Sequence, residues 1–135
     1  MIRLKNTKDF VIQMSVPGTQ AVGNDLEVNL VPFAGQIKAI YAKLGTAGTT
    51  STQVTDIKKN GVSIFSSGGL SFATGSQACT YGALTQNPTQ VAQGDILRID
   101  TTAINTTPGK DLAIFIVVEK LPGGQVAAML TDAVQ

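Results

Sequence analysis

The sequence predicts an all-β protein, an antiparallel β-sandwich or barrel of about seven or eight short strands. Short extended runs are separated by turn residues at intervals of about 8–12 residues. Apolar residues alternate with polar ones in several of these runs, as in strands with one buried face. The pair Asn60-Gly61 lies between two extended runs and favours the tight turn of a β-hairpin. No convincing helical pattern and no repeat of about 20–50 residues is present, which excludes a solenoid.

Two runs in the first quarter of the chain have the period of a half-buried strand. In Phe10 to Val16 the apolar residues recur at every second position, and Pro17-Gly18 ends the run. In Leu26 to Val31 the same alternation predicts three residues inward and two outward, and Pro32 ends the run because proline cannot donate to a strand ladder. The expected inward residues are Phe10, Ile12, Met14, Val16, Leu26, Val28 and Leu30, and the expected outward ones include Glu27 and Asn29.

The middle of the chain predicts three consecutive strands. Ile37 to Leu44 is the first, and Gly45 to Ser51 is a loop of small and polar residues. Thr52 to Lys59 is extended, and Val62 to Phe65 returns beside it after Asn60-Gly61. Both turn residues tolerate positive φ, as a type I′ turn requires, so this hairpin sets the register that neighbouring strands must follow.

The last third of the domain predicts two longer strands after a weakly patterned stretch. We expect Leu70 to Gly82 to be a long loop followed by a short strand, and Asp95 to Thr101 to place Leu97 and Ile99 on one face. Leu112 to Glu119 is apolar on both faces, which is typical of a strand covered on both sides. The residues expected in the core are Ile99, Phe115 and Val117, the rings Phe33, Phe65 and Phe72, and also Ala78 and Tyr81.

The expected organisation is one domain with two short arms. Residues 1–8 form an N-terminal arm, residues 9–121 the β domain, and residues 122–135 a C-terminal arm. Within the second arm, Val126, Met129 and Leu130 have helical spacing, but a helix this short is marginal in water and would be ordered only by docking. The outer face of the strand Leu112 to Glu119 must then be covered by an arm or by a second subunit.

The composition indicates a surface in contact with neighbours. Charged residues make up 14% of the chain, against about a quarter in an average soluble domain. The net charge of +1 supports neither nucleic-acid binding nor binding to a membrane surface. No secretory signal pattern follows Met1, and no apolar run approaches the roughly 18 residues needed to span a membrane. We therefore expect synthesis in a cytoplasm, with no nucleic-acid or membrane partner.

The sequence offers little equipment for catalysis. There is no histidine, and a single cysteine, Cys79, cannot form a thiolate zinc cluster, so it is interpreted as a small apolar filler. Asp95, Asp100 and Asp111 lie near strand ends, where a pair could act in a glycosidase or hold calcium, but turn formation is the favoured interpretation. Aromatic residues make up 5% and tryptophan is absent, which suits carbohydrate stacking poorly. We predict a non-enzyme with no catalytic, cofactor-binding or metal-binding residues.

Two blocks of sequence resemble a module of small virion proteins from tailed bacteriophages. The first block contains Gly45-Thr46-Ala47, then Asp56, Ile57, Lys59, Asn60, Gly61, Ile64 and Phe65. The second is Val91 to Leu97, followed by Asp100 and then Asp111-Leu112. The resemblance covers roughly residues 35 to 118 and is carried by turns and strand faces.

This resemblance implies a jelly-roll capsid decoration, or cement, protein. Its expected partner is the major capsid protein of the phage head, its expected state a homotrimer, and its expected location the virion, after synthesis in the host bacterial cytoplasm. A tail-tip or head-fibre receptor-binding domain is the alternative within the virion. A carbohydrate-binding or carbohydrate-active β-sandwich is the alternative from another class.

Overall fold

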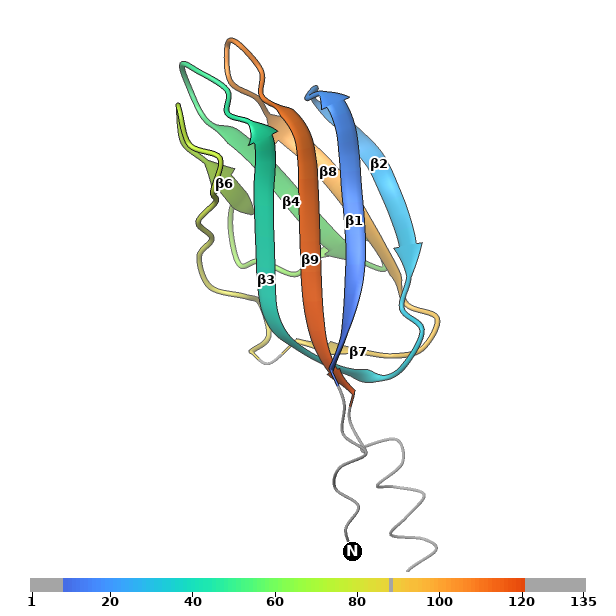
Figure 1. Cartoon of the computed structure of the whole chain (residues 1–135). Helices are drawn as coiled ribbons and strands as arrows, with labels where there is room; N and C mark the ends of the chain where they lie inside the picture. Colours follow the sequence, from blue (N-terminus) through green and yellow to red (C-terminus); the bar gives the residue numbers. More distant parts are fainter. Residues whose placement is uncertain (1–8, 88, 121–135) are drawn as a thin grey trace, which may run out of the picture.

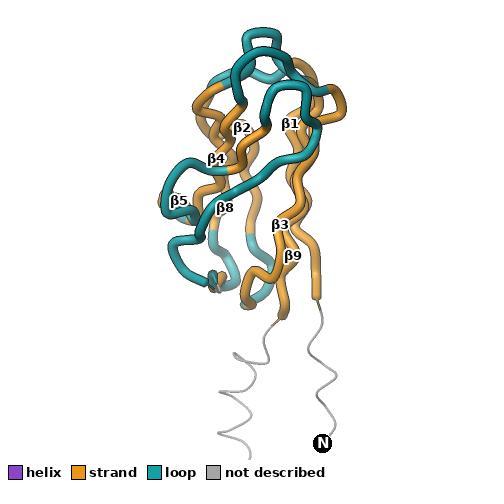
Figure 2. Tube along the Cα trace, turned by 90° about the vertical axis from the view of Figure 1, so that its left-hand side faces the viewer, coloured by secondary structure: helices purple, strands orange, loops and turns teal. Residues whose placement is uncertain are grey.

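The computed structural model describes residues 9–87 and 89–120, which form two facing antiparallel sheets (Figures 1 and 2). Sheet A has the strand order β1-β9-β3-β7, and sheet B has the order β2-β8-β4-β5, with β6 also paired to β4. The strands are β1 (Asp9–Thr19), β2 (Gly23–Leu30), β3 (Gly35–Thr46), β4 (Gln53–Lys59), β5 (Val62–Ser63), β6 (Leu70–Phe72), β7 (Gln90–Val91), β8 (Ile96–Ala103) and β9 (Lys110–Lys120).

The pairing of these strands is that of a jelly roll. Four antiparallel pairs are nested like the two arms of one long hairpin: β1 with β9, β2 with β8, β3 with β7, and β4 with β5. Two further pairings, β3 with β9 and β4 with β8, join the rolled hairpin into two layers, of four strands in sheet A and, with β6, five in sheet B. This topology confirms the expected fold class. The described residues contain nine strands rather than seven or eight, because three of them have only two or three residues.

The core lies between the two sheets and follows from strand alternation. On β9, Leu112, Ile114, Ile116 and Val118 all point inward and are buried. The alternation predicted for Phe10 to Val16 is present as well, with Ile12 and Met14 buried. The buried apolar residues are Ile12, Met14, Val31, Ile37, Ile40, Ala42, Leu44, Ile57, Ile64, Phe65, Leu70, Phe72, Val91, Leu97, Ile99, Leu112, Ile114, Ile116 and Val118.

The hairpin predicted at Asn60-Gly61 is confirmed. Lys59 of β4 pairs with Val62 of β5, which leaves the two turn residues between the strands. Both have positive φ, 52° at Asn60 and 86° at Gly61, as a type I′ turn requires. The returning strand is shorter than Val62 to Phe65, since β5 covers only Val62–Ser63.

The face assignment for Leu26 to Val31 was wrong. Val28 and Leu30 are exposed, whereas Glu27 and Asn29 are half-buried and share a face with the buried Ile99 and Leu97 of β8, to which they pair. The reason is that β2 is an edge strand, where a polar residue can face the rim of the core and still find a partner. Asn29 does so by donating from its side-chain amide to the carbonyl of Gln13, 3.1 Å away on β1.

Three expectations about aromatic burial were wrong as well. Phe115 is 42% exposed, because it alternates with Ile114 and Ile116 and lies on the outer face of sheet A. Phe33 is 47% exposed; its ring packs edge-on against Phe10, with the Lys120 ammonium 4.4 Å from the ring centre. Tyr81 is also exposed, while Phe65, Phe72 and Ile99 are buried as expected. Val117 is only half-buried, and Ala78 is exposed.

The stretch Leu70 to Gly82 has its elements in the opposite order to the prediction. The short strand β6 comes first and pairs with β4, and the loop follows. The loop runs down the side of the sandwich next to β3 (Figures 1 and 2). Two interactions attach it there: Lys43 bridges to Ala78, and the Leu44 N–H donates to the carbonyl of Gln77 at 2.9 Å.

The predicted arms, residues 1–8 and 122–135, lie outside the described residues, as does position 121 at the expected end of the domain. Among the residues that are described, no helix is long and apolar enough to cross a membrane.

Candidate interaction surface

The outer face of sheet A presents apolar side chains from its three long strands. The strand register places Gln13, Phe115 and Tyr41 in one row across β1, β9 and β3. Val11 and Val117 form part of the next row. Tyr41 is 63% exposed and Phe115 and Val11 more than two-fifths exposed, so this face is open to solvent in the described part of the chain. One face of Leu112 to Glu119 therefore belongs to the core, and the other is exposed in the described part of the chain; its coverage by an arm or a second subunit stays a prediction.

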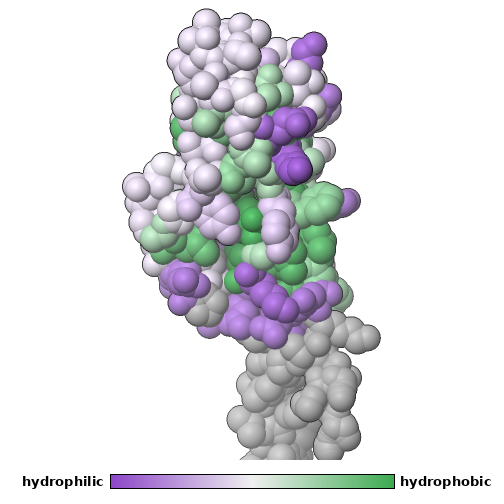
Figure 3. Space-filling model, turned by 60° about the vertical axis from the view of Figure 1, so that its left-hand side comes forward, coloured by the Kyte–Doolittle hydropathy of each residue, from purple (hydrophilic) through white to green (hydrophobic). Residues whose placement is uncertain are grey.

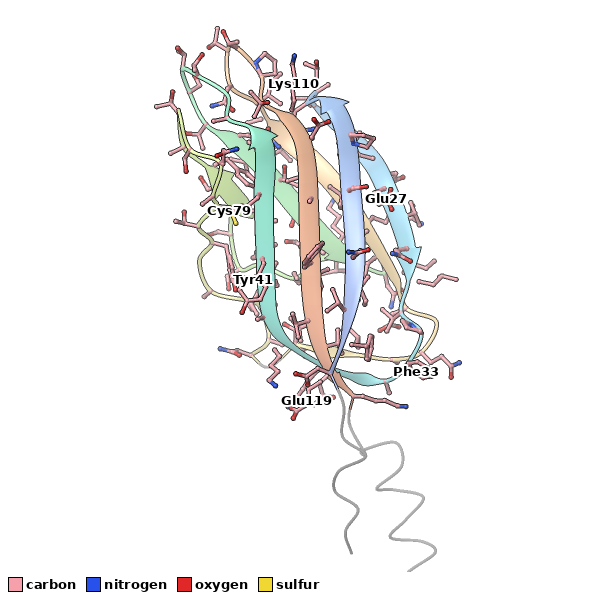
Figure 4. The ribbon with its side chains drawn as sticks, viewed as in Figure 1. Glu27, Phe33, Tyr41, Cys79, Lys110 and Glu119 are labelled. Carbon is pink, nitrogen blue, oxygen red and sulfur yellow. The ribbon has the colours of Figure 1, made fainter. Side chains whose placement is uncertain are left out.

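Beside β3, this face deepens into an apolar groove of about 490 Å³. Its lining includes Tyr41 and Lys43 from β3, Phe115 from β9, and Cys79 and Tyr81 from the loop after β6. Figure 4 shows Tyr41 and Cys79 on the same side of the sandwich. Figure 3 shows hydrophobic side chains gathered in the middle of this side, with hydrophilic ones below them. Lys43 is the only charged residue of the lining.

The groove owes its shape to the way the loop is held. The Gln77 side-chain amide donates to the carbonyls of Leu44, at 3.2 Å, and Gly45, at 2.8 Å, which fastens the loop to the upper part of β3. Further along, the ring of Tyr81 packs edge-on against the buried Phe65, with 5.7 Å between the ring centres. Two fixed points therefore hold the far wall of the groove opposite β3.

Cys79 lies in this wall as a half-buried packing residue. Burial raises the pKa of its thiol, and hydrogen bonds from the backbone N–H groups of Ala42 and of Cys79 itself offset this only in part. A raised pKa leaves little thiolate at neutral pH, and the chain contains no histidine that could act as its base. The geometry agrees with the interpretation of Cys79 as an apolar filler.

The three aspartates singled out in the sequence do not meet. Asp95 precedes β8 in sheet B, Asp111 is the second residue of β9 in sheet A, and each carboxylate has its own partners. Asp95 accepts hydrogen bonds from the Ala92 N–H at 2.8 Å and the Asn60 side chain at 3.0 Å. Burial raises the pKa of Asp95, but these bonds outweigh it and the net pKa is lowered. Asp111 accepts from the Gly18 N–H at 2.7 Å.

Asp100 belongs instead to a charged cluster on the outer face of sheet B that sequence reasoning missed. Its carboxylate lies 2.8 Å from the Lys58 ammonium and accepts from the Asp25 N–H at 2.7 Å. Asp56 stands opposite Asp100 in the β4–β8 register, and the Arg98 guanidinium lies 3.2 Å from the Asp25 carboxylate. The alternation of β4 places Asp56 and Lys58 on one face, but only the long-range β4–β8 pairing brings Asp100 to them.

This cluster is not arranged like an active site. Asp56 is 8% exposed and accepts from the Ser63 hydroxyl at 2.6 Å. The shallow depression beside it, about 560 Å³, is lined by Lys58, Arg98 and Asp100, whereas Asp56 lies outside the lining. Among the residues that the structure describes, no group of three or more His, Cys, Asp or Glu side chains is placed to hold a metal ion.

No protein-family model matches this chain, and comparisons with curated proteins and with solved structures found no significant similarity.

Proposed function

We propose that this protein is a non-enzymatic structural protein of a tailed-phage virion, a decoration protein that binds the major capsid shell as a homotrimer. The observation that carries the proposal is the outer face of sheet A, where Tyr41, Phe115 and Val11 are exposed on strands whose other face is the core. Exposed apolar surface of this kind is typical of protein–protein interfaces. The jelly-roll topology and the low charge of the chain support the same function.

The mechanism is mechanical. Copies of the protein bind across joints between capsid subunits, so that each bound trimer adds contact area between subunits that would otherwise separate. Many weak contacts act together, because once one contact has formed the others become intramolecular. A surface of uncharged polar and apolar residues suits such static contact, since it requires little desolvation of charge.

A second candidate function is supported by one feature of the groove. Three of the chain's aromatic rings, Tyr41, Tyr81 and Phe115, lie around it, and rings of this kind are the platforms on which sugars stack. A glycan-binding domain, including a receptor-binding domain of a tail tip or head fibre, would use this groove. The groove, however, has few polar groups that could bind sugar hydroxyls, and Lys43 is the only charged residue of its lining. The structural function is therefore favoured.

The experiment that tests the proposal adds the purified protein to expanded phage heads that lack it. Heads and bound protein are then sedimented together, and site occupancy is measured by electron microscopy of the particles. We expect saturable binding at symmetry-related sites and a higher temperature of head disruption. Binding is expected to fall in Tyr41→Ser, because loss of the trimer removes the joint action of its contacts with the head, while the control Val62→Ser, which changes an exposed apolar residue on sheet B, should bind normally. If the protein does not bind to heads but does bind to a glycan array, the structural function is wrong and the second candidate takes its place.

A further inference from the structure

The strand register of sheet A places surfaces from its two sides at matching heights. In one row, Phe115 of β9 pairs with Gln13 of β1 and with Tyr41 of β3. The next row on this face has Ser15 and Lys43 at its two ends. At these rows β1 is one edge of the sheet and β3 the other, because β7 pairs only with the first two residues of β3. Tyr41 and Lys43, which line the groove, thus lie level with two residues of the opposite edge.

At the β1 edge, the two sheets leave a shallow depression of about 360 Å³. Its lining includes the apolar residues Val11, Leu30 and Pro32 and the side-chain amides of Gln13 and Asn29. The Asn29 amide donates to the Gln13 carbonyl at 3.1 Å, which holds β2 beside β1 at this height. Apolar walls with an amide among them suit a tyrosine side chain, which has an apolar ring and one polar atom.

The single charge of the groove has a complementary charge at the β1–β2 edge. Glu27 is the only carboxylate among the described residues that has neither an ion pair nor a hydrogen bond there. The chain reverses direction between β1 and β2, so Glu27, two residues before Asn29, lies near the height of Ser15, two residues after Gln13 (Figure 1). Figure 4 shows Glu27 at this edge. Glu27 therefore lies near the height of Lys43.

We propose that Tyr41 of one copy inserts into the β1–β2 depression of the next copy, and that this head-to-tail contact joins the subunits of the homotrimer. The ring of Tyr41 packs between Val11 and Leu30 of the neighbouring copy, and its hydroxyl meets the Gln13 amide. Lys43 pairs with Glu27 of the same neighbour. The inference rests on the trimer of the proposed function and identifies its interface.

The matching heights favour a closed ring. Copies in a ring whose axis runs along the strands are related by rotation alone, so residues at one height meet residues at the same height. The contact of Tyr41 and that of Lys43 therefore form together. Because the depression and Tyr41 lie on opposite sides of β9, one partner cannot cover both, and such a heterologous contact repeats until the ring closes. A tyrosine seated in a pocket is a common centre of an interface.

The β1–β2 edge has about the size that an interface requires. Strand β1 has 11 residues, which makes the edge about 36 Å long, and the two sheets lie about 10 Å apart. The strip between the sheets therefore measures roughly 360 Å². The exposed side chains of Val11, Val28 and Leu30 widen it toward the roughly 800 Å² that each partner contributes to a stable interface. The contact thus uses the whole edge rather than one ring alone.

A disulfide in place of the ion pair tests the contact. The full chain carries Cys79→Ser, which removes the native cysteine, together with Lys43→Cys and Glu27→Cys. Lys43 is two strand spacings, about 10 Å, from β1, and a disulfide spans at most about 7 Å between Cα atoms, so every bridge joins two copies. Mild oxidation should give a covalent trimer on a non-reducing gel, with the link between positions 27 and 43 identified by peptide mass spectrometry.

The matched control carries Cys79→Ser, Lys43→Cys and Val62→Cys, whose second cysteine is exposed on sheet B away from this edge. It should give at least tenfold less covalent trimer. A product that stops at the dimer, or one without the link between positions 27 and 43, overturns the head-to-tail contact.

Charge reversal tests the same pair without a covalent bond. Lys43→Glu and Glu27→Lys should each weaken the trimer several-fold in sedimentation equilibrium, and the chain that carries both should recover. Tyr41→Phe, which keeps the ring and removes the hydroxyl, should weaken the trimer less than Tyr41→Ser. A double charge variant that associates no better than either single variant overturns the pairing of Lys43 with Glu27.

These results separate the inference from the proposed function. A covalent trimer that fails to bind phage heads leaves the contact standing and shows that the decoration function is wrong. A protein that decorates heads as a trimer without forming the disulfide leaves the function standing and shows that the contact is wrong.

Discussion

Asp56 and Asp100 lie directly opposite each other on β4 and β8, yet their environments move their acidities in opposite directions. Burial raises the pKa of Asp56 more than the hydrogen bonds from Ser63 and Ile57 and the charge of Lys58 lower it. Burial also raises the pKa of Asp100, but the Lys58 ammonium and the Asp25 N–H outweigh it and the net pKa is lowered. Lys58 thus interacts mainly with the Asp100 carboxylate, and ionisation of the Asp56 carboxylate remains unfavourable.

Asp56→Asn is expected to stabilise the protein at neutral pH. Because the pKa of Asp56 is raised in the folded state, the folded protein holds the proton more tightly than the unfolded chain. The contribution of the protonated group is fully present below the unfolded value of about 3.9 and is lost as the pH rises through the folded pKa. Denaturant unfolding from pH 3 to pH 7 should show the variant gaining on the wild type as the pH increases. The opposite pH dependence is expected for Asp100: the stability that its carboxylate contributes is lost as the pH falls through its lowered pKa.

Ser63→Ala tests the titration of Asp56 through its hydrogen-bond donor. It removes the hydroxyl that donates to the Asp56 carboxylate at 2.6 Å and so should raise the pKa of Asp56 further. The fall of stability with pH should then be steeper than in the wild type. A pH dependence that is identical in wild type, Asp56→Asn and Ser63→Ala would show that Asp56 does not titrate differently in the folded state.

Gly61→Ala should destabilise the fold by about 1 kcal/mol or more. The φ of Gly61 is 86°, and a methyl group added there would have no neighbour within 4 Å, so the cost comes from backbone conformation alone. Gly82→Ala is the control, since its added methyl group also has open space but its φ is not positive. Denaturant midpoints of the two variants measure the difference; equal midpoints would contradict the type I′ turn.

Ile114→Ala and Phe115→Ala compare the two faces of β9. Ile114 is fully buried, and its truncation should cost about 2–5 kcal/mol through lost burial and a cavity. Phe115 is 42% exposed on the outer face, so its truncation should cost well under the 3–5 kcal/mol of a buried ring. Chemical denaturation at low protein concentration gives both values. A larger loss for Phe115 than for Ile114 would mean that the faces are reversed.

Tyr41→Ser should weaken self-association while leaving the fold intact. Tyr41 is the most exposed ring of the outer face of sheet A, and an aromatic residue at the centre of an interface commonly contributes 2 kcal/mol or more, which is about thirtyfold in Kd. Sedimentation equilibrium of wild type and variant at micromolar concentration measures this change. Val62→Ser, on sheet B, should not alter it. If the wild-type protein sediments as a monomer at every concentration measured, the proposed trimer is wrong.

Local chemistry determined much of this fold. The Asn60-Gly61 turn follows from two residues that tolerate positive φ, and the inward residues Ile12, Met14, Leu97 and Ile99 follow from alternation within their own strands. The residues of Leu112 to Glu119 likewise showed, without any knowledge of their partners, that this strand is apolar on both faces. The sequence also indicated that an exposed apolar surface would need a partner.

Only the tertiary structure decided which of two faces is the core, and which distant residues meet. Phe115 and Ile114 are both apolar, so alternation alone does not say which faces the second sheet, and the edge position of β2 inverted the expected faces of Val28 and Leu30. The groove requires a loop after β6 that is fastened to β3, and the Asp56–Asp100 pair requires the β4–β8 register. Both depend on contacts between residues more than thirty positions apart, whose partners are selected by the packing of the whole sandwich rather than by any local pattern.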